Sequence, residues 1–165
     1  MSSFFNIFKI NFLKFLTIYV FLYLLIMKKL IILRGVPGSG KSTYAKNLIK
    51  YLTDVGFTAV SYEADTYFYD KDGNYNWNPD LLNNAHMWCQ HRVSEALMTH
   101  DFVIVANTNI DRKSVKKYIK IAKECNAEYV VLRLGTRFQN VHEVPADVVE
   151  NMATKMVDIE GEKIV

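Results

Sequence analysis

The residues in this sequence that are best suited to chemistry lie in one glycine-rich stretch. The phosphate-binding pattern G-x-x-x-x-G-K-[ST] is matched at every position by Gly35-Val36-Pro37-Gly38-Ser39-Gly40-Lys41-Ser42, and Thr43 follows it. Its glycines let the backbone turn tightly, so that successive N–H groups point at one phosphate. The ammonium of Lys41 adds a charge for the β- and γ-phosphates, and the hydroxyl of Ser42 is the usual Mg²⁺ ligand. The stretch therefore predicts a nucleoside triphosphate site, with ATP and Mg²⁺ as cofactors.

The segments on either side of this phosphate loop (residues 35–42) have the order that such a loop requires. Residues 29–33 form a short apolar run that suits a buried parallel strand. After the loop, apolar side chains recur with helical spacing over residues 45–52, and Gly56 stands where helices commonly end. The sequence therefore predicts a strand, the loop and a helix in succession.

Strands and helices continue to alternate along the rest of the chain. Further strands are expected at 57–62, 102–106 and 129–134. Helices are expected to start at Asn78, at a capping box over residues 108–111, and at Pro145. This alternation predicts a P-loop NTPase fold of the α/β class, a three-layer sandwich with a mainly parallel sheet. Ligands of such sheets bind at the carboxyl ends of the strands. Those ends are expected at Arg34–Gly35, Asp65, Asn107–Thr108 and Gly135–Thr136.

Composition limits the kinds of protein this can be. The 165 residues suffice for one domain with a core, which is expected at residues 27–160. Two of the 20 basic residues, Lys9 and Lys14, precede that domain, which leaves 18 basic against 17 acidic side chains from residue 27 on. This balance argues against a globally basic nucleic-acid binder. The two cysteines are far apart in sequence, which argues against a zinc site and fits a reducing, cytoplasmic compartment.

Residues 1–26 form a separate hydrophobic segment without an acidic residue, glycine or proline. The longest uncharged run, 15–27, has 13 residues, whereas a membrane-spanning helix needs about 20. Two interpretations stay open. The segment is an in-plane or partial membrane anchor, which would make the protein membrane-associated, or it is upstream sequence in front of a start at Met27.

Four blocks of sequence together resemble one family. They are LIILRGVPGSGKST, EADTYFYDKDGNYNWNPDLLNNAHMWCQ, VIVANTNI and NVHEVP, in this order. The chain resembles the polynucleotide-kinase-like P-loop kinases, which include the 5′-kinase domain of phage polynucleotide kinase. It is more similar to the related domain of the Nedd-type ubiquitin-ligase-binding proteins. The resemblance covers Met27 to about Val157 and implies transfer of the γ-phosphate of ATP to a hydroxyl. The 5′-hydroxyl at a nucleic acid end is a candidate acceptor.

In the family that the chain resembles, an aspartate after the second strand is the general base, and Asp65 is the matching residue. The physical argument agrees, because a carboxylate at a strand end opposite the phosphate loop is placed to take a proton from an attacking alcohol. The alternative is that Asp65 only caps the loop that follows it.

Three positions depart from the family pattern. Phe68 stands where the phage enzyme has an arginine, and Ala106 stands where the relatives have an acid on the third strand. Asn107 is then left to bind a water on the metal or to position Asp65. In the lid segment, Gln139-Asn140 replaces Arg-Asn. Arg137 is the candidate catalytic arginine that closes on the phosphates, with Arg133 and Arg112 as alternatives.

Other side chains suggest acceptor contacts. His86 lies on a predicted helix face beside the acceptor side, where it contacts the acceptor or makes a structural hydrogen bond. Tyr67 and its aromatic neighbours either stack a base or hold their loop in place. A lysine stripe within residues 113–123 either holds nucleic-acid phosphates or is a solvated face, and such stripes are more often solvated. Two further functions stay open, a nucleoside or metabolite kinase and a nucleotide-binding module without catalysis.

Overall fold

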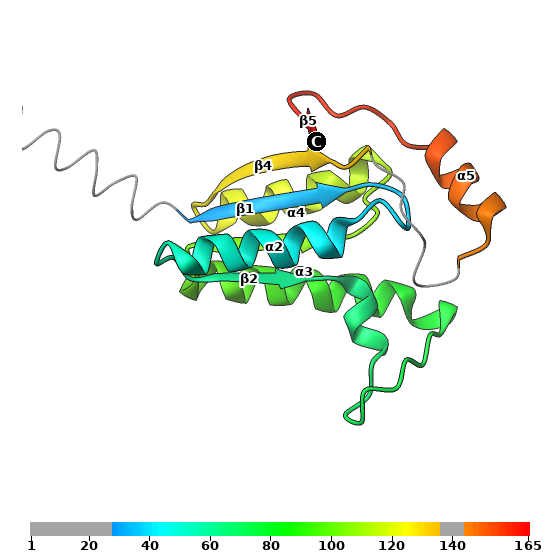
Figure 1. Cartoon of the computed structure of the whole chain (residues 1–165), viewed down its shortest axis with the longest axis horizontal. Coiled ribbons are helices and arrows are strands. Elements are labelled where there is room, and N and C mark those ends of the chain that lie inside the picture. The colour runs from blue at the N-terminus through cyan, green and yellow to red at the C-terminus, as the bar shows by residue number, and fades with distance from the viewer. Residues whose placement is uncertain (1–27, 136–143) are drawn as a thin grey trace, which may run out of the picture.

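A parallel sheet forms the centre of the molecule in the computed structural model, which describes residues 28–135 and 144–165 (Figure 1). Five strands pair in the order β2-β3-β1-β4-β5, and every pairing is parallel. They are β1 Lys29–Arg34, β2 Ala59–Tyr62, β3 Phe102–Ala106, β4 Glu128–Arg133 and β5 Lys163–Ile164. The α/β class and the parallel sheet that the sequence predicts are confirmed.

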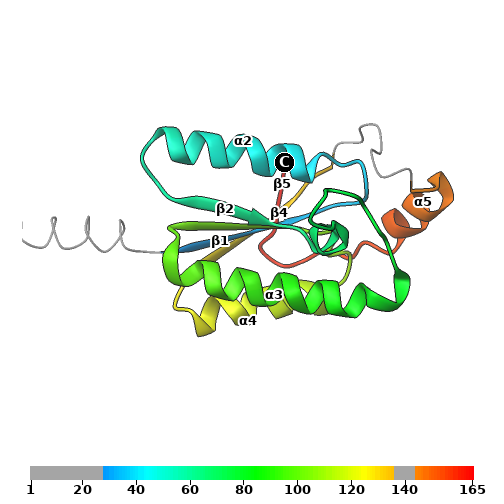
Figure 2. The same ribbon diagram turned by 90° about the horizontal axis from the view of Figure 1, so that it is seen from below.

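Helices cover both faces of this sheet. The α-helices are α2 Lys41–Asp54, α3 Leu82–Thr99, α4 Arg112–Glu124 and α5 Ala146–Thr154, and two 3₁₀ turns are η1 Ala64–Phe68 and η2 Pro79–Leu81. Figure 2 shows the sheet edge-on, with α2 on one side and α3 and α4 on the other. α5 lies beyond the end at which the strands finish. The arrangement is the predicted three-layer sandwich.

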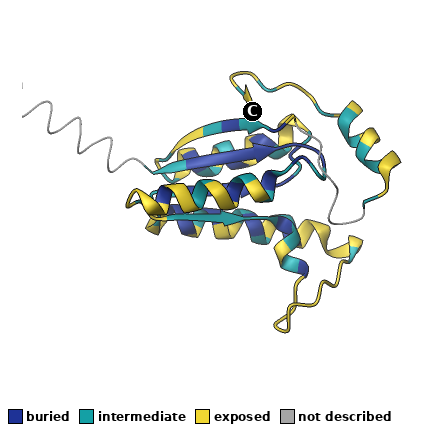
Figure 3. Cartoon of the chain, viewed as in Figure 1, coloured by how far each residue is buried: buried dark blue, intermediate teal, exposed yellow. Residues whose placement is uncertain are grey.

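Two neighbouring strands, β1 and β3, are buried on both faces, and Figure 3 shows β1 as a buried strand. Their side chains alternate between the faces, as expected of strands. Leu30, Ile32, Val103 and Val105 pack toward α3 and α4. Ile31, Leu33, Ile104 and Ala106 pack toward α2. Because burial on both faces fixes the register, the ends of β1 and β3 lie side by side.

Some element boundaries differ from the sequence prediction. The capping box predicted at residues 108–111 is wrong, since the N-cap of α4 is Asp111, whose side chain accepts a hydrogen bond from the Ser114 N–H at 2.7 Å. Thr108 instead uses its carbonyl to accept from the Gly35 N–H at 3.1 Å. Residues 107–110 are thus engaged in tertiary contacts and cannot start the helix. Asn78 was predicted to start a helix. It is instead the N-cap of the short turn η2, and α3 begins directly after that turn.

The C-terminal strand β5 was not predicted, because two exposed residues carry no alternating pattern. It pairs with β4, so the sheet continues past the expected domain end at residue 160. In the described part of the chain, no helix combines the length and apolar character needed to cross a membrane. The hydrophobic segment 1–26, with its two interpretations, lies outside the described residues.

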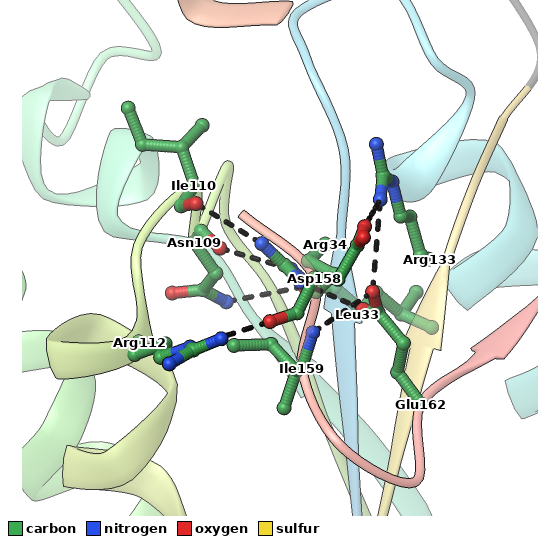
Figure 4. Close-up of polar contacts among 9 residues, drawn as sticks. All are labelled: Leu33, Arg34, Asn109, Ile110, Arg112, Arg133, Asp158, Ile159 and Glu162. Atoms are coloured by element: carbon green, nitrogen blue, oxygen red, sulfur yellow. Dashed lines mark hydrogen bonds and ion pairs between the residues drawn. The ribbon is translucent and has the colours of Figure 1, made fainter. Parts of the chain in front are cut away.

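A buried ion pair fastens the C-terminal segment to β1 (Figure 4). Arg34 is fully buried, and its Nη1 lies 2.7 Å from Glu162 Oε2. Its Nε and Nη2 donate to the carbonyls of Asn109 and Ile110, each at 3.0 Å. Arg133 lies 3.7 Å from the other carboxylate oxygen of Glu162. Glu162 therefore neutralises the cation that immediately precedes the phosphate loop.

This ion pair yields a stability prediction. Glu162→Ala leaves the Arg34 guanidinium buried without a carboxylate, and breaking such a pair costs about 3–5 kcal/mol of unfolding free energy. Asp158→Ala is the control, because Asp158 is 91% exposed and pairs with Arg133 at the surface. Exposed substitutions of this kind change stability by less than about 0.5–1 kcal/mol. Urea unfolding monitored by circular dichroism measures both. Equal losses in the two variants would contradict a special role for Glu162.

Candidate active site

The phosphate loop connects β1 to α2 at the carboxyl edge of the sheet. Gly35, Gly38 and Gly40 have φ angles of 154°, 76° and 86°. A Cβ atom on Gly35 would lie 2.4 Å from Ser39 Oγ and 3.0 Å from the Leu134 carbonyl oxygen. The close approach and the backbone angle both require glycine at position 35.

The N-terminus of α2 is suited to an anion. Its N-cap is Gly40, which offers no side-chain acceptor, and its first turn contains no acidic residue. The first N–H groups of a helix lack intrahelical partners and carry the positive end of the helix dipole. A phosphate would satisfy both features, so the loop fits the triphosphate that its sequence predicts. Around it, Ser39 is buried, Pro37 is half-buried and Thr43 is exposed.

Lys41 lies inside this loop with 9% of its surface exposed. Its Nζ donates to the carbonyl oxygens of Gly35 and Val36, each at 2.9 Å. Burial lowers the pKa of Lys41 to about 8, although the carboxylates of Glu63 and Asp65 act in the opposite direction. The ammonium is therefore held where a bound phosphate would stabilise its charge.

Glu63 is a site residue that the sequence reasoning missed. It follows β2 directly, and its Oε2 accepts a hydrogen bond from Ser42 Oγ at 2.8 Å. A carboxylate thus contacts the hydroxyl expected to bind Mg²⁺. The available signal was an acidic residue at the end of a predicted strand, two positions before Asp65.

Asp65 lies in the turn η1 and is partly buried. Its charge opposes the lowering of the pKa of Lys41 in the phosphate loop and of His86 on α3, so it lies near both. The structure therefore brings the expected base and the expected phosphate-binding lysine to one edge of the sheet. The assignment of Asp65 as general base stays a prediction.

The Asn107-Thr108-Asn109 block joins the phosphate loop to the turn that carries Asp65. The Asn107 side chain is buried, its Oδ1 accepts from the Ala64 N–H at 2.8 Å, and its Nδ2 donates to Tyr118 Oη at 2.9 Å. Asn109 Nδ2 donates to the Leu33 carbonyl at 3.1 Å. These contacts fit the alternative in which Asn107 positions Asp65. A direct contact between Asn107 and a substrate stays a prediction.

The expected acceptor side chains lie on α3 and η1. His86 is partly buried, and burial together with the charge of Lys117 lowers its pKa, while Asp65 acts in the opposite direction. The imidazole is therefore mainly neutral at pH 7. The ring of Tyr67 lies 6.0 Å from that of Trp88 and 5.7 Å from that of Phe68. These neighbours fix the orientation of Tyr67 beside Asp65.

Of the three arginines considered for closing the site, the structure describes Arg133 and Arg112. Arg133 Nη1 lies 2.7 Å from Asp158 Oδ1, and Arg112 Nε donates to the Asp158 carbonyl at 3.4 Å. Both side chains therefore contact the C-terminal segment. Arg137, with Gln139-Asn140, lies outside the described residues.

Comparison with known proteins places this geometry in a family. The sequence model of the AAA domain family matches residues 30–153. L-seryl-tRNA(Sec) kinase of Methanococcus maripaludis is 28% identical over 142 residues, which are 81% of this chain and 54% of that protein. NEDD4-binding protein 2 of Homo sapiens is 34% identical over 96 residues, 58% of this chain and 5% of that protein. The chain thus spans about half or less of the length of these relatives.

Solved structures share the fold. Kti12 of Chaetomium thermophilum, solved in complex with ADP-AlF3, superposes with a TM-score of 0.63 and 17% identity, covering 82% of this chain and 88% of that one. A chain of the Pnkp1/Rnl/Hen1 RNA repair complex gives a TM-score of 0.62 and 21% identity over 79% of this chain and 44% of that one. Together with the sequence matches, these structures confirm the predicted resemblance to P-loop kinases.

The lowered pKa of Lys41 makes nucleotide binding depend on protons. With a pKa of about 8, about half of the lysines are neutral at pH 8, and a bound triphosphate would restore the ammonium. We expect Mg·ATP binding to take up about half a proton per site at pH 8 and almost none at pH 6.5. Calorimetry in buffers of different ionisation enthalpy measures this uptake. In Lys41→Arg, the matched control, the side chain stays charged and the uptake should vanish.

The same pKa sets a pH dependence of stability. The unfolded lysine has its ordinary pKa of 10.5, so between pH 8 and 10.5 the unfolded chain binds more protons than the nucleotide-free folded protein. The contribution of Lys41 to the free energy of unfolding therefore rises with pH across that interval. In the calorimetric experiment above, Mg·ATP binding without proton uptake at pH 8 would contradict a buried, partly neutral Lys41.

Proposed function

Because the chain belongs to the AAA domain family and has a P-loop kinase among its relatives, we propose that it is an ATP-dependent phosphotransferase acting on a hydroxyl group. One observation carries the proposal. The Glu63 carboxylate accepts a hydrogen bond from Ser42 Oγ at 2.8 Å, and Asp65 follows two residues later in η1, so an acidic turn faces the phosphate loop. Phosphoryl transfer needs hydrogen-bond donors that hold the phosphates, a ligand for the metal and a base for the acceptor hydroxyl, and this arrangement combines the three.

The chain's own residues divide the binding of the cofactors between them. The loop N–H groups and Lys41 hold the phosphates. Ser42 is the protein ligand for Mg²⁺, and because its proton is donated to Glu63 its lone pairs are available to the metal. Among the described residues, no three His, Cys, Asp or Glu side chains gather to hold a metal by themselves. When bound, ATP supplies the phosphoryl group, and Mg²⁺ supplies the positive charge that neutralises the phosphates.

Glu63 also provides an acidic residue in place of the one that is missing from the third strand. The third strand ends in Ala106, where the similar kinases carry an acid. Glu63 provides a carboxylate beside Ser42 from the neighbouring strand β2. We assign Glu63 to the outer coordination of the metal, where it orients Ser42.

Asp65 would take the proton of the acceptor hydroxyl as the hydroxyl oxygen bonds to the γ-phosphorus, while the bond from that phosphorus to the β,γ-bridging oxygen breaks and ADP leaves. Asn107 fixes the turn η1 through Ala64 and thereby holds Asp65 toward the site. The neutral imidazole of His86 offers one donor and one acceptor to the acceptor molecule.

The 5′-hydroxyl of a polynucleotide is the acceptor that we favour. The fold is shared with a chain of an RNA repair complex. In addition, Tyr69, Tyr75 and Trp77 expose aromatic surface on the loop that follows Asp65. Exposed aromatic rings can stack on nucleic-acid bases without sequence preference. A nucleoside or metabolite acceptor is the alternative, and it predicts faster transfer to the monomer than to an oligonucleotide.

A non-catalytic nucleotide-binding module is a second candidate, which the Ala106 position favours. It predicts that ATP binds but that no acceptor is phosphorylated. A panel of 5′-hydroxyl oligonucleotides, nucleosides and small alcohols with γ-labelled ATP separates the three functions.

Replacing the proposed base tests the mechanism. Asp65→Asn should slow transfer to the best acceptor by about 10²–10⁴-fold, the usual contribution of a general base. ATP affinity should be equal or higher, because a negative charge near the triphosphate is removed. Asp72→Asn, in the exposed loop that follows, is the control and should keep full activity. Full activity in Asp65→Asn would show that another group accepts the proton.

The assignment of Glu63 has a separate test. Glu63→Gln keeps the size of the side chain and removes its charge beside Ser42. Residues that orient a metal ligand typically contribute about 10–100-fold to metal affinity. We therefore expect the Mg²⁺ concentration for half-maximal transfer to rise at least about tenfold. An unchanged Mg²⁺ requirement would limit Glu63 to a structural hydrogen bond.

A further inference from the structure

One face of α4 carries a shallow groove lined only by cations. Its lining residues, which we call the cationic groove, are Arg112, Lys113, Lys116, Lys117 and Lys120. The groove has a volume of about 520 Å³. The opposite face of α4 packs into the core through Val115, Tyr118 and Ala122. The five charges therefore project together from a rigidly held helix.

Across the residues that the structure describes, most of the charges of the cationic groove have no carboxylate beside them. Some cations elsewhere do have a carboxylate within salt-bridge distance, as in the pairs Lys29–Glu128 at 3.2 Å and Lys50–Asp54 at 2.6 Å. In the groove, Lys120 pairs with Glu124 at 3.6 Å. In the described part of the chain, none of the other four cations has a carboxylate within salt-bridge distance. Because the domain as a whole is almost neutral, this concentration of unpaired charge is local.

The groove starts at the edge of the sheet where the candidate active site lies. α4 follows β3, so its first residue, Arg112, lies near the carboxyl ends of the strands. The charge of Lys117 acts on His86 of α3, and His86 also responds to Asp65. The cationic groove therefore lies next to the region of Asp65 and His86 and runs from there along the outer face of α4.

We propose that the cationic groove binds the phosphate backbone of a single-stranded nucleic acid whose 5′ end lies at Asp65. The inference rests on the proposed phosphotransferase function, because it assigns a polynucleotide to that acceptor site. From Lys113 to Lys120 the helix rises by about 10 Å, which is long enough for its cations to contact more than one phosphate of a strand. A single strand fits better than a duplex, because its terminal hydroxyl has to reach a partly buried carboxylate.

Charge reversal tests this binding without any catalysis. The probe is a twelve-nucleotide 5′-hydroxyl single strand, labelled at its 3′ end and followed by fluorescence anisotropy without ATP. Lys116→Glu combined with Lys117→Glu should weaken binding about tenfold or more in low salt. The slope of log K against log salt should also fall by about 1.4, at about 0.7 for each phosphate that the variant no longer neutralises. Circular dichroism verifies that the variant is folded.

A matched control removes the effect of net charge. Lys46→Glu with Lys50→Glu makes the same charge change on exposed positions of α2, across the sheet from α4. This control should bind the probe within about twofold of the wild type, and Lys116→Arg with Lys117→Arg should restore tight binding. Equal weakening in both Glu variants, or no weakening in either, would overturn the proposal. So would binding of the groove to anionic lipid vesicles but not to the oligonucleotide.

The outcome is separable from that of the proposed function. If the wild type phosphorylates no acceptor but the groove variant alone loses oligonucleotide binding, the groove assignment holds and the phosphotransferase proposal fails. If transfer occurs only to nucleosides and oligonucleotide binding does not depend on the groove, the phosphotransferase proposal holds and the groove assignment fails.

Discussion

The parallel pairing of β1 with β3 is the constraint on which the site depends. Ile32 lies opposite Val105 and Leu33 opposite Ala106, and each of these side chains is buried. A shift of one residue would turn every apolar side chain to the wrong face, so the register is fixed. Both strands then end at the same level, and the Gly35 N–H can donate to the Thr108 carbonyl. The phosphate loop is positioned by the core beneath it.

From this edge the polar contacts extend in two directions. Asn107 reaches across to Ala64 and holds the turn that carries Asp65. On the other side, Arg34 binds the loop after β3 and takes its counter-ion, Glu162, from the C-terminal segment. The family match ends at residue 153, so this counter-ion comes from a segment beyond the matched residues. The site therefore depends on contacts between parts of the chain that are far apart in sequence.

The sequence predicted the features whose causes are local. Short apolar runs located the four longer strands, and the glycine pattern located the phosphate loop and Lys41. The features it missed depend on tertiary contacts. The role of Glu63 requires β2 to end beside α2, and β5 is too short to show a pattern. The N-cap of α4 moved from Thr108 to Asp111 because the intervening residues bind β1. Family resemblance supplied the role of Asp65, which the geometry alone does not distinguish from a capping role.

The central claim is that backbone N–H groups of the phosphate loop, together with the Lys41 ammonium, hold a nucleoside triphosphate. Equilibrium dialysis of the purified chain against labelled ATP, with and without Mg²⁺, tests it most directly. Saturable binding at one site per chain is predicted, lost in Lys41→Met and kept in Lys46→Met, which alters an exposed lysine of the same helix. Failure of the wild type to bind ATP or any other nucleoside triphosphate would contradict the account, as would undiminished binding by Lys41→Met.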